Sequence, residues 1–359
     1  MNKPFDELTF QHGPATANRF MLAPLTNCQS HPDGTLSDEE HHWLTMRATG
    51  GFGLVMTCAA HVQQVGQGFA GQLGVFGDQH VAGLTRLAAD LNVTSVSSVQ
   101  LHHAGNRSPA ELIGQQPVCP SDDPSTGSRA LTTAEVEGVI ADFVAAAVRA
   151  ERAGFHGVEL HGAHGYLICQ FLSADTNQRT DRYGGSLENR SRMLFDIIEG
   201  IRAACDGSFQ LAVRLSPDRF GMRTEEVVEI YRRLVADGNV DMIDMSLWDY
   251  SRAVPDGALA GTPLLDVFSE LDRGDVRLGV AGKIHDPSDV DAVLGRGVDI
   301  AVLGRVAILH HDYPLQLSKD SGFVPRRRPA SQEVLLSEGL SPSFVDYMRR
   351  NFKGFVTER

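Results

Sequence analysis

The sequence has little of several features that would assign it to particular classes of protein. Its five cysteines are scattered and odd in number, and no two of them form a C-x-x-C pair: Cys28, Cys58, Cys119, Cys169 and Cys205. Neither a disulfide framework nor a thiolate metal site is therefore indicated, and a reducing cytoplasm is the expected location. The first residues, MNKPFDELTFQHG, lack the apolar core of a secretory signal.

Long apolar runs and basic runs are also scarce. No stretch approaches the roughly 18 apolar residues that a membrane span needs, so no membrane association is expected. The formal charge is −13, and the one local basic run is the RRR of residues 326–328. Such a chain repels phosphate backbones, and nucleic acid is not an expected partner.

Short β-branched runs, in contrast, recur along the 359 residues, each followed by a polar or Gly-rich loop and a helical pattern. Eight such runs are present: RFMLAP, GLVMTCA, TSVSSVQL, GVELH, LAVRLS, VDMIDMS, RLGVAG and VDIAVLG. Near-continuous apolar strands are typical of parallel sheets. Eight βα units in order predict a (β/α)8 TIM barrel, and the rival doubly wound sheet lacks its G-x-G-x-x-G turn after the first strand.

Several helices have recognisable start signals. Ser37 with Glu40 and Thr132 with Glu135 fit the S/T-x-x-E capping box, and Asp286 precedes an N1 proline. Residues 1–320 are predicted to form the barrel. The Pro-rich and then helical segment 321–359 is predicted to be a C-terminal extension that packs on the barrel or on a neighbouring subunit.

The strand ends are where a barrel of this kind places its active site. Two of them, after the seventh and eighth runs, read Gly282-Lys283 and Gly304-Arg305. Loops at these two positions commonly form a phosphate site, in which exposed N–H groups and a helix N-terminus face the anion. Either glycine alone could be an ordinary turn, but both pairs, each followed by a cation, favour a phosphate site.

Two polar residues within strands have two readings each. Arg214 lies in an apolar strand, where an unpartnered charge is costly. A structural salt bridge and a role at the pocket are equally compatible with it. Gln100 could cap a loop, or it could point at whatever carries the phosphate.

The segment HGAHGY holds His161 and His164, which could bind a metal together with His102 as a third ligand. Glu159, on the same strand as His161, is expected to alternate away from the pocket. Because no acidic residue stands at a strand end to complete a hydrolase site, the sequence favours hydrogen-bond donors here and no metal.

Beyond these local readings, the segment GFHGVELHGAHGYLICQFLSADTNQRTDRYGGSLENRSRMLFDIIEGIR resembles the signature of the Old Yellow Enzyme family, FMN-dependent ene-reductases on a (β/α)8 barrel. The similarity covers nearly all of residues 18–310, including NRFMLAPLT, VQLHHAGNR, AVRLSP, VAGKI and VLGR.

The resemblance implies that FMN lies at the carboxyl ends of the strands. Its phosphate would lie on Gly282, Lys283, Gly304 and Arg305. Thr26, in the loop Ala23-Pro24-Leu25-Thr26, would touch the O4 and N5 region of the flavin, with Ala59 and Gln100 at the pyrimidine edge. Arg214 would place positive charge by N1, where the reduced ring is an anion.

The same resemblance implies the reaction, the reduction of α,β-unsaturated carbonyl compounds by a ping-pong mechanism with NAD(P)H as hydride donor. His161 and His164 would hold the carbonyl oxygen as an oxyanion hole does. Hydride would pass from flavin N5 to the β-carbon, and Tyr166 would give a proton to the α-carbon.

Substrate contacts are harder to assign. Where short bacterial members have a cysteine and, two residues on, a tyrosine, this chain has Thr26 and Cys28, so Cys28 is a candidate contact. The loop after the sixth strand offers Trp248, which could line the pocket or merely pack. A C-terminal arginine reaches a neighbouring subunit in some relatives, and Arg349 or Arg350 is the candidate here in a possible homo-oligomer.

Three alternatives stay open. A His-liganded metal hydrolase or lyase could use the same barrel. A flavin-dependent demethylase or oxidative dehydrogenase would keep the cofactor and change the reaction, and a flavin-binding barrel could have a non-catalytic role.

Overall fold

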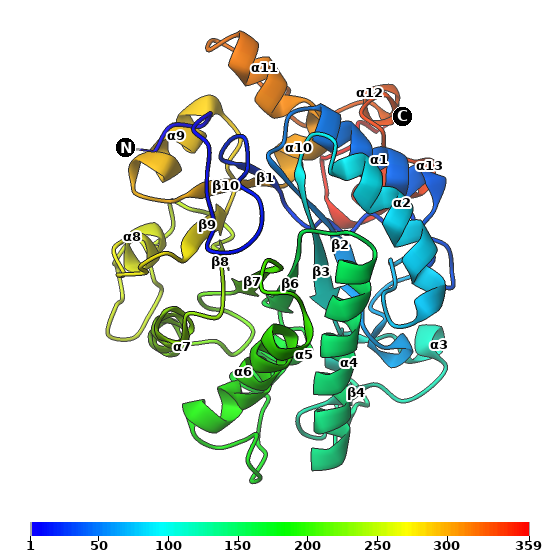
Figure 1. Cartoon of the computed structure of the whole chain (residues 1–359), viewed down its shortest axis with the longest axis vertical. Helices are drawn as coiled ribbons and strands as arrows, with labels where there is room; N and C mark the ends of the chain where they lie inside the picture. Colours follow the sequence, from blue (N-terminus) through cyan, green and yellow to red (C-terminus); the bar gives the residue numbers. More distant parts are fainter. Residues whose placement is uncertain (1, 359) are drawn as a thin grey trace.

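Eight parallel strands close into a barrel in this computed structural model, which describes residues 2–358. Their order around the barrel is β1-β10-β9-β8-β7-β6-β3-β2, and β1 pairs with both β10 and β2 (Figure 1). Each of the eight runs seen in the sequence holds one strand, which confirms the (β/α)8 fold. The strands are β1 (Phe20–Leu22), β2 (Leu54–His61), β3 (Val96–His102), β6 (Gly157–Gly162), β7 (Gln210–Leu215), β8 (Met242–Ser246), β9 (Arg277–Ala281) and β10 (Ile300–Leu303).

Helices surround the strands in Figure 1 and bury their apolar faces against them. They are α1 (Asp38–Thr49), α2 (Val81–Leu91), α3 (Ala110–Ile113), α4 (Thr133–Arg152), α5 (Leu167–Leu172), α6 (Leu187–Ala204), α7 (Thr224–Asp237), α8 (Leu264–Ser269), α9 (Pro287–Gly295), α10 (Arg305–Leu309), α11 (Tyr313–Lys319), α12 (Gln332–Ser337) and α13 (Pro342–Asn351). A small parallel pair, β4 (Val118–Cys119) and β5 (Arg129–Ala130), lies in the long connection after β3.

Three of these helices begin where their capping chemistry predicts. Thr132 and Glu135 form a reciprocal capping box before α4, and Asp286 does the same with Asp289 before α9. At α1 the Ser37 hydroxyl accepts from the N–H of Glu40 at 3.0 Å. The Glu40 carboxylate instead accepts from buried Asn27 and Ser30, so the second half of that box is missing.

The barrel interior is apolar at its amino-terminal end and polar at its carboxyl end. Inward side chains at the apolar end pack together with Leu8 of the N-terminal segment: Met21, Ala23, Leu54, Met56, Val96, Ala212, Met242, Ile300 and Val302. Phe10 packs beside them. Further along the strands the inward positions of four strands become polar, at Gln100, Glu159, Arg214 and Asp244, and the cavity opens above them.

The C-terminal segment packs on its own barrel. The ring of Phe344 on α13 meets Trp43 on α1 edge to face, with 4.9 Å between centroids. The N–H of Ser341 donates to the Gln29 side chain at 2.9 Å. This contact places α13 beside the loop that follows β1, at the carboxyl ends of the strands.

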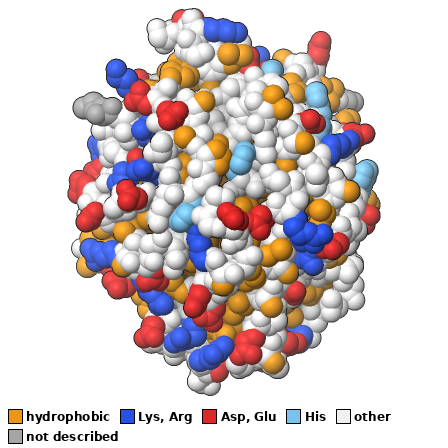
Figure 2. All heavy atoms as spheres, viewed as in Figure 1, with side chains coloured by type: hydrophobic (Ala, Val, Ile, Leu, Met, Phe, Trp, Pro, Cys, Tyr) orange, Lys and Arg blue, Asp and Glu red, His pale blue; other side chains and the backbone are white. Residues whose placement is uncertain are grey.

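No helix within residues 2–358 is long and apolar enough to cross a membrane. Acidic and basic side chains are interspersed over the face drawn in Figure 2.

Candidate functional site

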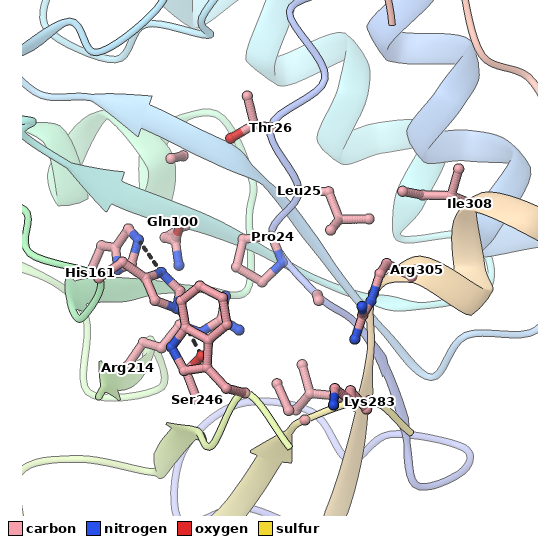
Figure 3. Close-up of a pocket in the computed structure, with 18 of the residues that line it drawn as sticks. Pro24, Leu25, Thr26, Gln100, His161, Arg214, Ser246, Lys283, Arg305 and Ile308 are labelled. Carbon is pink, nitrogen blue, oxygen red and sulfur yellow. Dashed lines mark hydrogen bonds between the residues drawn. The ribbon is translucent and has the colours of Figure 1, made fainter. Parts of the chain in front are cut away.

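A cavity of about 350 Å³ opens at the carboxyl ends of the barrel strands, within the size range of small-molecule sites. All but one of the residues predicted for the site line it. Figure 3 shows the polar side chains of β3, β6, β7 and β8 on one side, and those of the β9 and β10 loops on the other. The predicted residues that line the cavity are Ala23, Pro24, Leu25, Thr26, Ala59, Gln100, His161, His164, Tyr166, Arg214, Trp248, Gly282, Lys283, Gly304 and Arg305.

His161 and His164 form one side of this cavity, together with Tyr166, and we call these three side chains the histidine wall. His161 is the penultimate residue of β6, and the chain then turns sharply because His164 adopts a left-handed backbone conformation, with φ of 61°. The Ser216 hydroxyl accepts from the N–H of His164 at 3.0 Å, and Arg107 donates to its carbonyl. These contacts stabilise the turn that brings the two imidazoles together.

The two imidazoles contact each other directly. Nδ1 of His164 lies 3.3 Å from Nε2 of His161, and Nε2 of His164 lies 2.8 Å from the Ser246 hydroxyl. Nδ1 of His161 is buried and has no hydrogen-bond partner among the residues that the structure describes. Both imidazoles line the cavity, so a ligand there would lie against them.

Burial keeps these histidines uncharged. Desolvation lowers the pKa of both His161 and His164 well below the usual range, and repulsion within the pair and from Arg214 and Arg107 acts in the same direction. At neutral pH each imidazole is neutral and carries a single N–H, which is the form that can donate to a carbonyl oxygen without bringing a buried charge.

Tyr166 stands at the start of α5, directly above His102 and His161. Its ring meets that of His102 nearly edge on, at 4.3 Å between centroids, and that of His161 at 5.1 Å. The Arg107 guanidinium lies 4.6 Å from the centre of the tyrosine ring, in a cation–π contact. These neighbours fix the ring, and Tyr166 lines the cavity.

Gln100 and Arg214 form the floor, and two buried carboxyl groups lie beneath them. Gln100 Nε2 donates to Glu159 at 2.7 Å, and Arg214 Nε lies 2.9 Å from Asp244. The expectation that Glu159 alternates away from His161 is wrong, because residues two apart on a strand share a face and Glu159 points into the barrel, although it lies beneath the floor and does not line the cavity. The salt-bridge reading of Arg214 and the pocket reading are both right.

On the opposite side, the loops after β9 and β10 carry Lys283 and Arg305. Gly282 has no room for a side chain, since an added Cβ would lie 2.9 Å from the N atom of Tyr250. Lys283 has a φ of 57°, and its ammonium group lies 2.6 Å from Asp249. Gly304 precedes the short helix α10 and leaves the backbone accessible beside Leu25.

The C-terminal segment adds a third cation beside these two. Arg328 lines a second hollow of about 350 Å³ together with Lys283 and Arg305, in the size range of small-ligand sites. Burial and the neighbouring Arg328 lower the pKa of Arg305. No carboxylate among residues 2–358 forms an ion pair with Arg305 or Arg328. We call Lys283, Arg305 and Arg328 the cation rim.

Cys28 does not line the cavity, contrary to its prediction as a substrate contact. Its φ of 56° turns the chain aside, and the residue lies in a neighbouring crevice with Tyr347 and Arg350. Burial raises the pKa of the Cys28 thiol to about 11, so it is protonated at neutral pH. Arg349 binds Asp346 and Gln332 of its own chain.

Several cavity residues come from segments that sequence reasoning did not single out. Tyr347, Met348 and Phe352 of the C-terminal segment line the mouth, and Phe220 stands 6.4 Å from the Trp248 ring beside it. Tyr347, Met348 and Phe352 follow no barrel strand, so no positional signal marked them, whereas Phe220 lies in the loop after β7. Trp248, which is 44% exposed, forms part of the wall at the entrance.

The donor set suits a flavin mononucleotide. The unpaired guanidinium groups of Arg305 and Arg328 and the open backbone at Gly282 match a phosphate, and Gln100 and Arg214 offer donors at the other end of the cavity. No group of three or more His, Cys, Asp or Glu side chains within residues 2–358 is arranged to hold a metal ion.

Comparison with known proteins gives the same assignment. The model of the family described as "NADH:flavin oxidoreductase / NADH oxidase family" matches residues 5–321. The chain belongs to this family. It is 35% identical over 326 residues to a probable NADH-dependent flavin oxidoreductase of Bacillus subtilis, covering 88% of this chain and 87% of that protein.

Two further relatives show the range of the family. An NADH:fumarate oxidoreductase of Klebsiella pneumoniae is 32% identical over 86% of this chain, but the match spans 35% of that longer protein. The solved structure of an Old Yellow Enzyme homologue from Zymomonas mobilis has a TM-score of 0.80 and 26% identity, covering 96% of this chain and 99% of that one.

A structure of morphinone reductase in complex with tetrahydroNAD has a TM-score of 0.78 and 25% identity, over 93% of this chain and 94% of that one. As a member of this family, the protein is a flavin oxidoreductase that uses FMN and takes its hydride from NADH or NADPH. The resemblance to the Old Yellow Enzyme family is thus confirmed.

Proposed function

We propose that this flavin oxidoreductase reduces the activated C=C bond of α,β-unsaturated carbonyl compounds. The observation that carries the proposal is the histidine wall. His161 is buried and His164 half-buried, both imidazoles are neutral, and Nδ1 of His164 lies 3.3 Å from Nε2 of His161 beside a tyrosine that lines the same cavity. Paired neutral donors suit an oxygen on which negative charge develops during a reaction.

In this proposal His161 and His164 donate to the carbonyl oxygen of the substrate. They polarise the conjugated C=C bond and stabilise the enolate charge that hydride addition at the β-carbon creates. The Tyr166 hydroxyl then gives its proton to the α-carbon, and the product leaves as the saturated carbonyl compound.

The remaining cavity residues hold FMN, which supplies the hydride after accepting it from NAD(P)H in the same cavity. Gly282, Lys283, Gly304 and Arg305 would bind its phosphate, and the Ala23-Pro24-Leu25-Thr26 segment, which lines the same cavity, would lie against the ring. Ala59, Gln100 and Arg214 contact its pyrimidine end, where the guanidinium favours the reduced, negatively charged form. Trp248 and the residues of the C-terminal segment enclose the substrate.

Anaerobic turnover tests the reaction. We expect the holoenzyme with NADH or NADPH and 2-cyclohexenone to yield cyclohexanone, with parallel double-reciprocal plots because one cavity serves both half-reactions in turn. An enzyme that oxidises NAD(P)H with oxygen but reduces no enone would contradict the proposal. Turnover of an N-methylated substrate in place of enones would favour a demethylase.

A further inference from the structure

The two residues of the cavity floor, Gln100 and Arg214, form a closed group with two buried acids beneath them. These acids are Glu159 and Asp244. Glu159 and Asp244 have no exposed surface, and Gln100 and Arg214, which separate them from the cavity, are almost completely buried. Glu159 accepts from Gln100 at 2.7 Å, and Asp244 lies 2.9 Å from Arg214. Glu159 and Asp244 thus each contact a side chain that lines the cavity.

The hydrogen bonds of this group do not suit two ionised acids. Within the described residues, Oδ1 of Asp244 and Oε2 of Glu159 are buried without a hydrogen-bond partner, and Oδ2 of Asp244 has only the ion pair with Arg214. A buried carboxylate without hydrogen bonds is strongly disfavoured relative to its protonated form. Two carboxylates against the single charge of Arg214 would also leave a net negative charge inside the barrel.

The charged and titratable neighbours of Glu159 are few. Arg214 faces it from β7 and Asp244 from β8, while His161 on its own strand and His102 on β3 lie above it. Burial lowers the pKa of both histidines well below the usual range, so they carry no charge at neutral or alkaline pH. The proton balance of the group therefore depends on Glu159, Asp244, Arg214 and any charge placed in the cavity.

We propose that the Glu159–Asp244 pair is a redox-linked proton site, which binds one more proton from solvent when the cofactor above Gln100 and Arg214 gains negative charge. This inference goes beyond the proposed reaction. It uses the proposed position of the pyrimidine end of FMN over these two residues, but it does not depend on the nature of the oxidising substrate.

The step balances without a further reactant. NAD(P)H delivers a hydride, which is two electrons and one proton, so the cofactor gains one negative charge. A carboxylate of the pair then binds one proton from solvent and becomes a carboxyl group, and the total charge of floor and cofactor is unchanged. Since the site lies in a medium of low dielectric constant, the added charge acts strongly on it.

The pH range in which reduction takes up the extra proton depends on the pKa of the pair in the oxidised enzyme. Burial, with repulsion from Asp244, raises the pKa of Glu159 well above its usual value against the opposing effect of Arg214. In the proposal the pair therefore holds the proton in both redox states at neutral pH. In alkaline solution the oxidised enzyme loses this proton and the reduced enzyme retains it, so reduction takes up one extra proton there.

The midpoint potential of bound FMN, measured against pH by spectroelectrochemistry, tests the proposal without any enone. For a two-electron couple each proton taken up contributes roughly 30 mV per pH unit. We expect the midpoint potential to fall by roughly 30 mV per pH unit between pH 6.5 and 7.5 and by roughly 60 mV per pH unit above pH 8. In Glu159→Gln the slope should stay near the lower value throughout.

Glu40→Gln is the matched control. Glu40 is also fully buried and hydrogen bonded to an amide, that of Asn27, and burial raises its pKa, but it lies outside the barrel. It should keep the slope of the unaltered enzyme. A slope of the unaltered enzyme that does not change above pH 8, or the same steepening in Glu159→Gln, would overturn the proposal.

Should Glu159→Gln fail to fold or to retain FMN, infrared difference spectra of the unaltered enzyme decide the matter. With ¹³C-labelled glutamate and aspartate, reduction at pH 9 should produce an isotope-sensitive carboxyl C=O band that reduction at pH 7 does not. Absence of that band at pH 9 would contradict the assignment. Because both measurements need only bound FMN, they can succeed even if every enone fails as a substrate.

Discussion

The histidine wall lies on the opposite side of the cavity from Lys283 and Arg305 of the cation rim, and wall and rim differ in burial and charge (Figure 3). Of the wall histidines, His161 is buried and His164 half-buried; both are neutral, and backbone and side-chain contacts fix them. The side chains of the rim are charged, and Lys283 is 58% exposed. Hydrogen bonds from desolvated dipoles are strong and depend on direction, whereas exposed cations attract an anion over a wider range of positions.

This difference indicates a division of roles between the two sides. Groups that act on a developing charge must be preorganised, because reorganisation during the reaction would cost activation energy. Groups that hold a phosphate need charge and access. Substitutions in the wall should therefore change reaction rates and leave cofactor binding intact, and substitutions in the rim should do the reverse.

The largest effect is expected for His164→Ala. Loss of one of two donors at the carbonyl oxygen should slow enone reduction by about 100- to 1,000-fold. FMN should stay bound, because substitutions in the wall are expected to leave cofactor binding intact. The visible spectrum of the variant reports bound FMN directly. Stopped-flow rates of the oxidative half-reaction measure the change, and release of FMN in this variant would contradict the division of roles.

A smaller loss, roughly 100-fold, is expected for Tyr166→Phe, which removes the proton donor and keeps the ring that packs on His102 and Arg107. The oxidative half-reaction should slow, while reduction by NAD(P)H should proceed at its usual rate. Equal slowing of both half-reactions would show that the tyrosine only shapes the cavity.

On the rim, Arg305→Gln should weaken FMN binding by roughly 10- to 100-fold, the value of a charge-assisted hydrogen bond. Fluorescence quenching of FMN titrated with apoprotein gives the dissociation constant. Arg296→Gln is the control, because Arg296 is an exposed arginine that pairs with Asp266. Loss of enone reactivity with unchanged FMN affinity in Arg305→Gln would reverse the assigned roles.

A still smaller change, about tenfold in KM, is expected for Trp248→Ala. The tryptophan is partly exposed at the entrance and stacks with Arg219, whose guanidinium lies 4.5 Å from its ring. Removing a hydrophobic contact weakens substrate binding by about 1–3 kcal/mol and leaves the reacting groups in place. A change confined to kcat would not fit a wall of the entrance.

The smallest effect is the one expected from pH. Because the pKa values of His161 and His164 are lowered, both imidazoles stay neutral as the pH falls through 6.5, where an ordinary histidine gains its proton. The rate of enone reduction by the reduced enzyme should therefore be constant between pH 6 and 8. A rate that titrates near pH 6.5 would show that the histidine pair changes charge.

Much of this arrangement could be predicted from the sequence, since it depends on position along a strand. His161 follows an apolar strand, Gly282 and Gly304 follow two others, and barrel geometry brings strand ends together. Tyr347 and Met348 could not be found in this way. They reach the cavity from a C-terminal helix whose path depends on tertiary packing.

Two wrong predictions have physical causes. Glu159 was predicted to alternate away from His161. Side chains two residues apart on a strand lie on the same face, so it points to the same side as His161. Cys28 was misplaced because a left-handed turn at that residue is not visible in its neighbours' composition. In both cases the local backbone, and not the residue type, decides what the side chain can contact.

The most direct test of the account is a single turnover of reduced holoenzyme with 2-cyclohexenone in the absence of oxygen. The account predicts that the absorbance of oxidised FMN returns at a rate that saturates with enone concentration, with one cyclohexanone formed per FMN. It also predicts that the rate falls by about 100-fold or more in His164→Ala. Reduced enzyme that stays reduced with every enone tried, yet reoxidises in air, would contradict it.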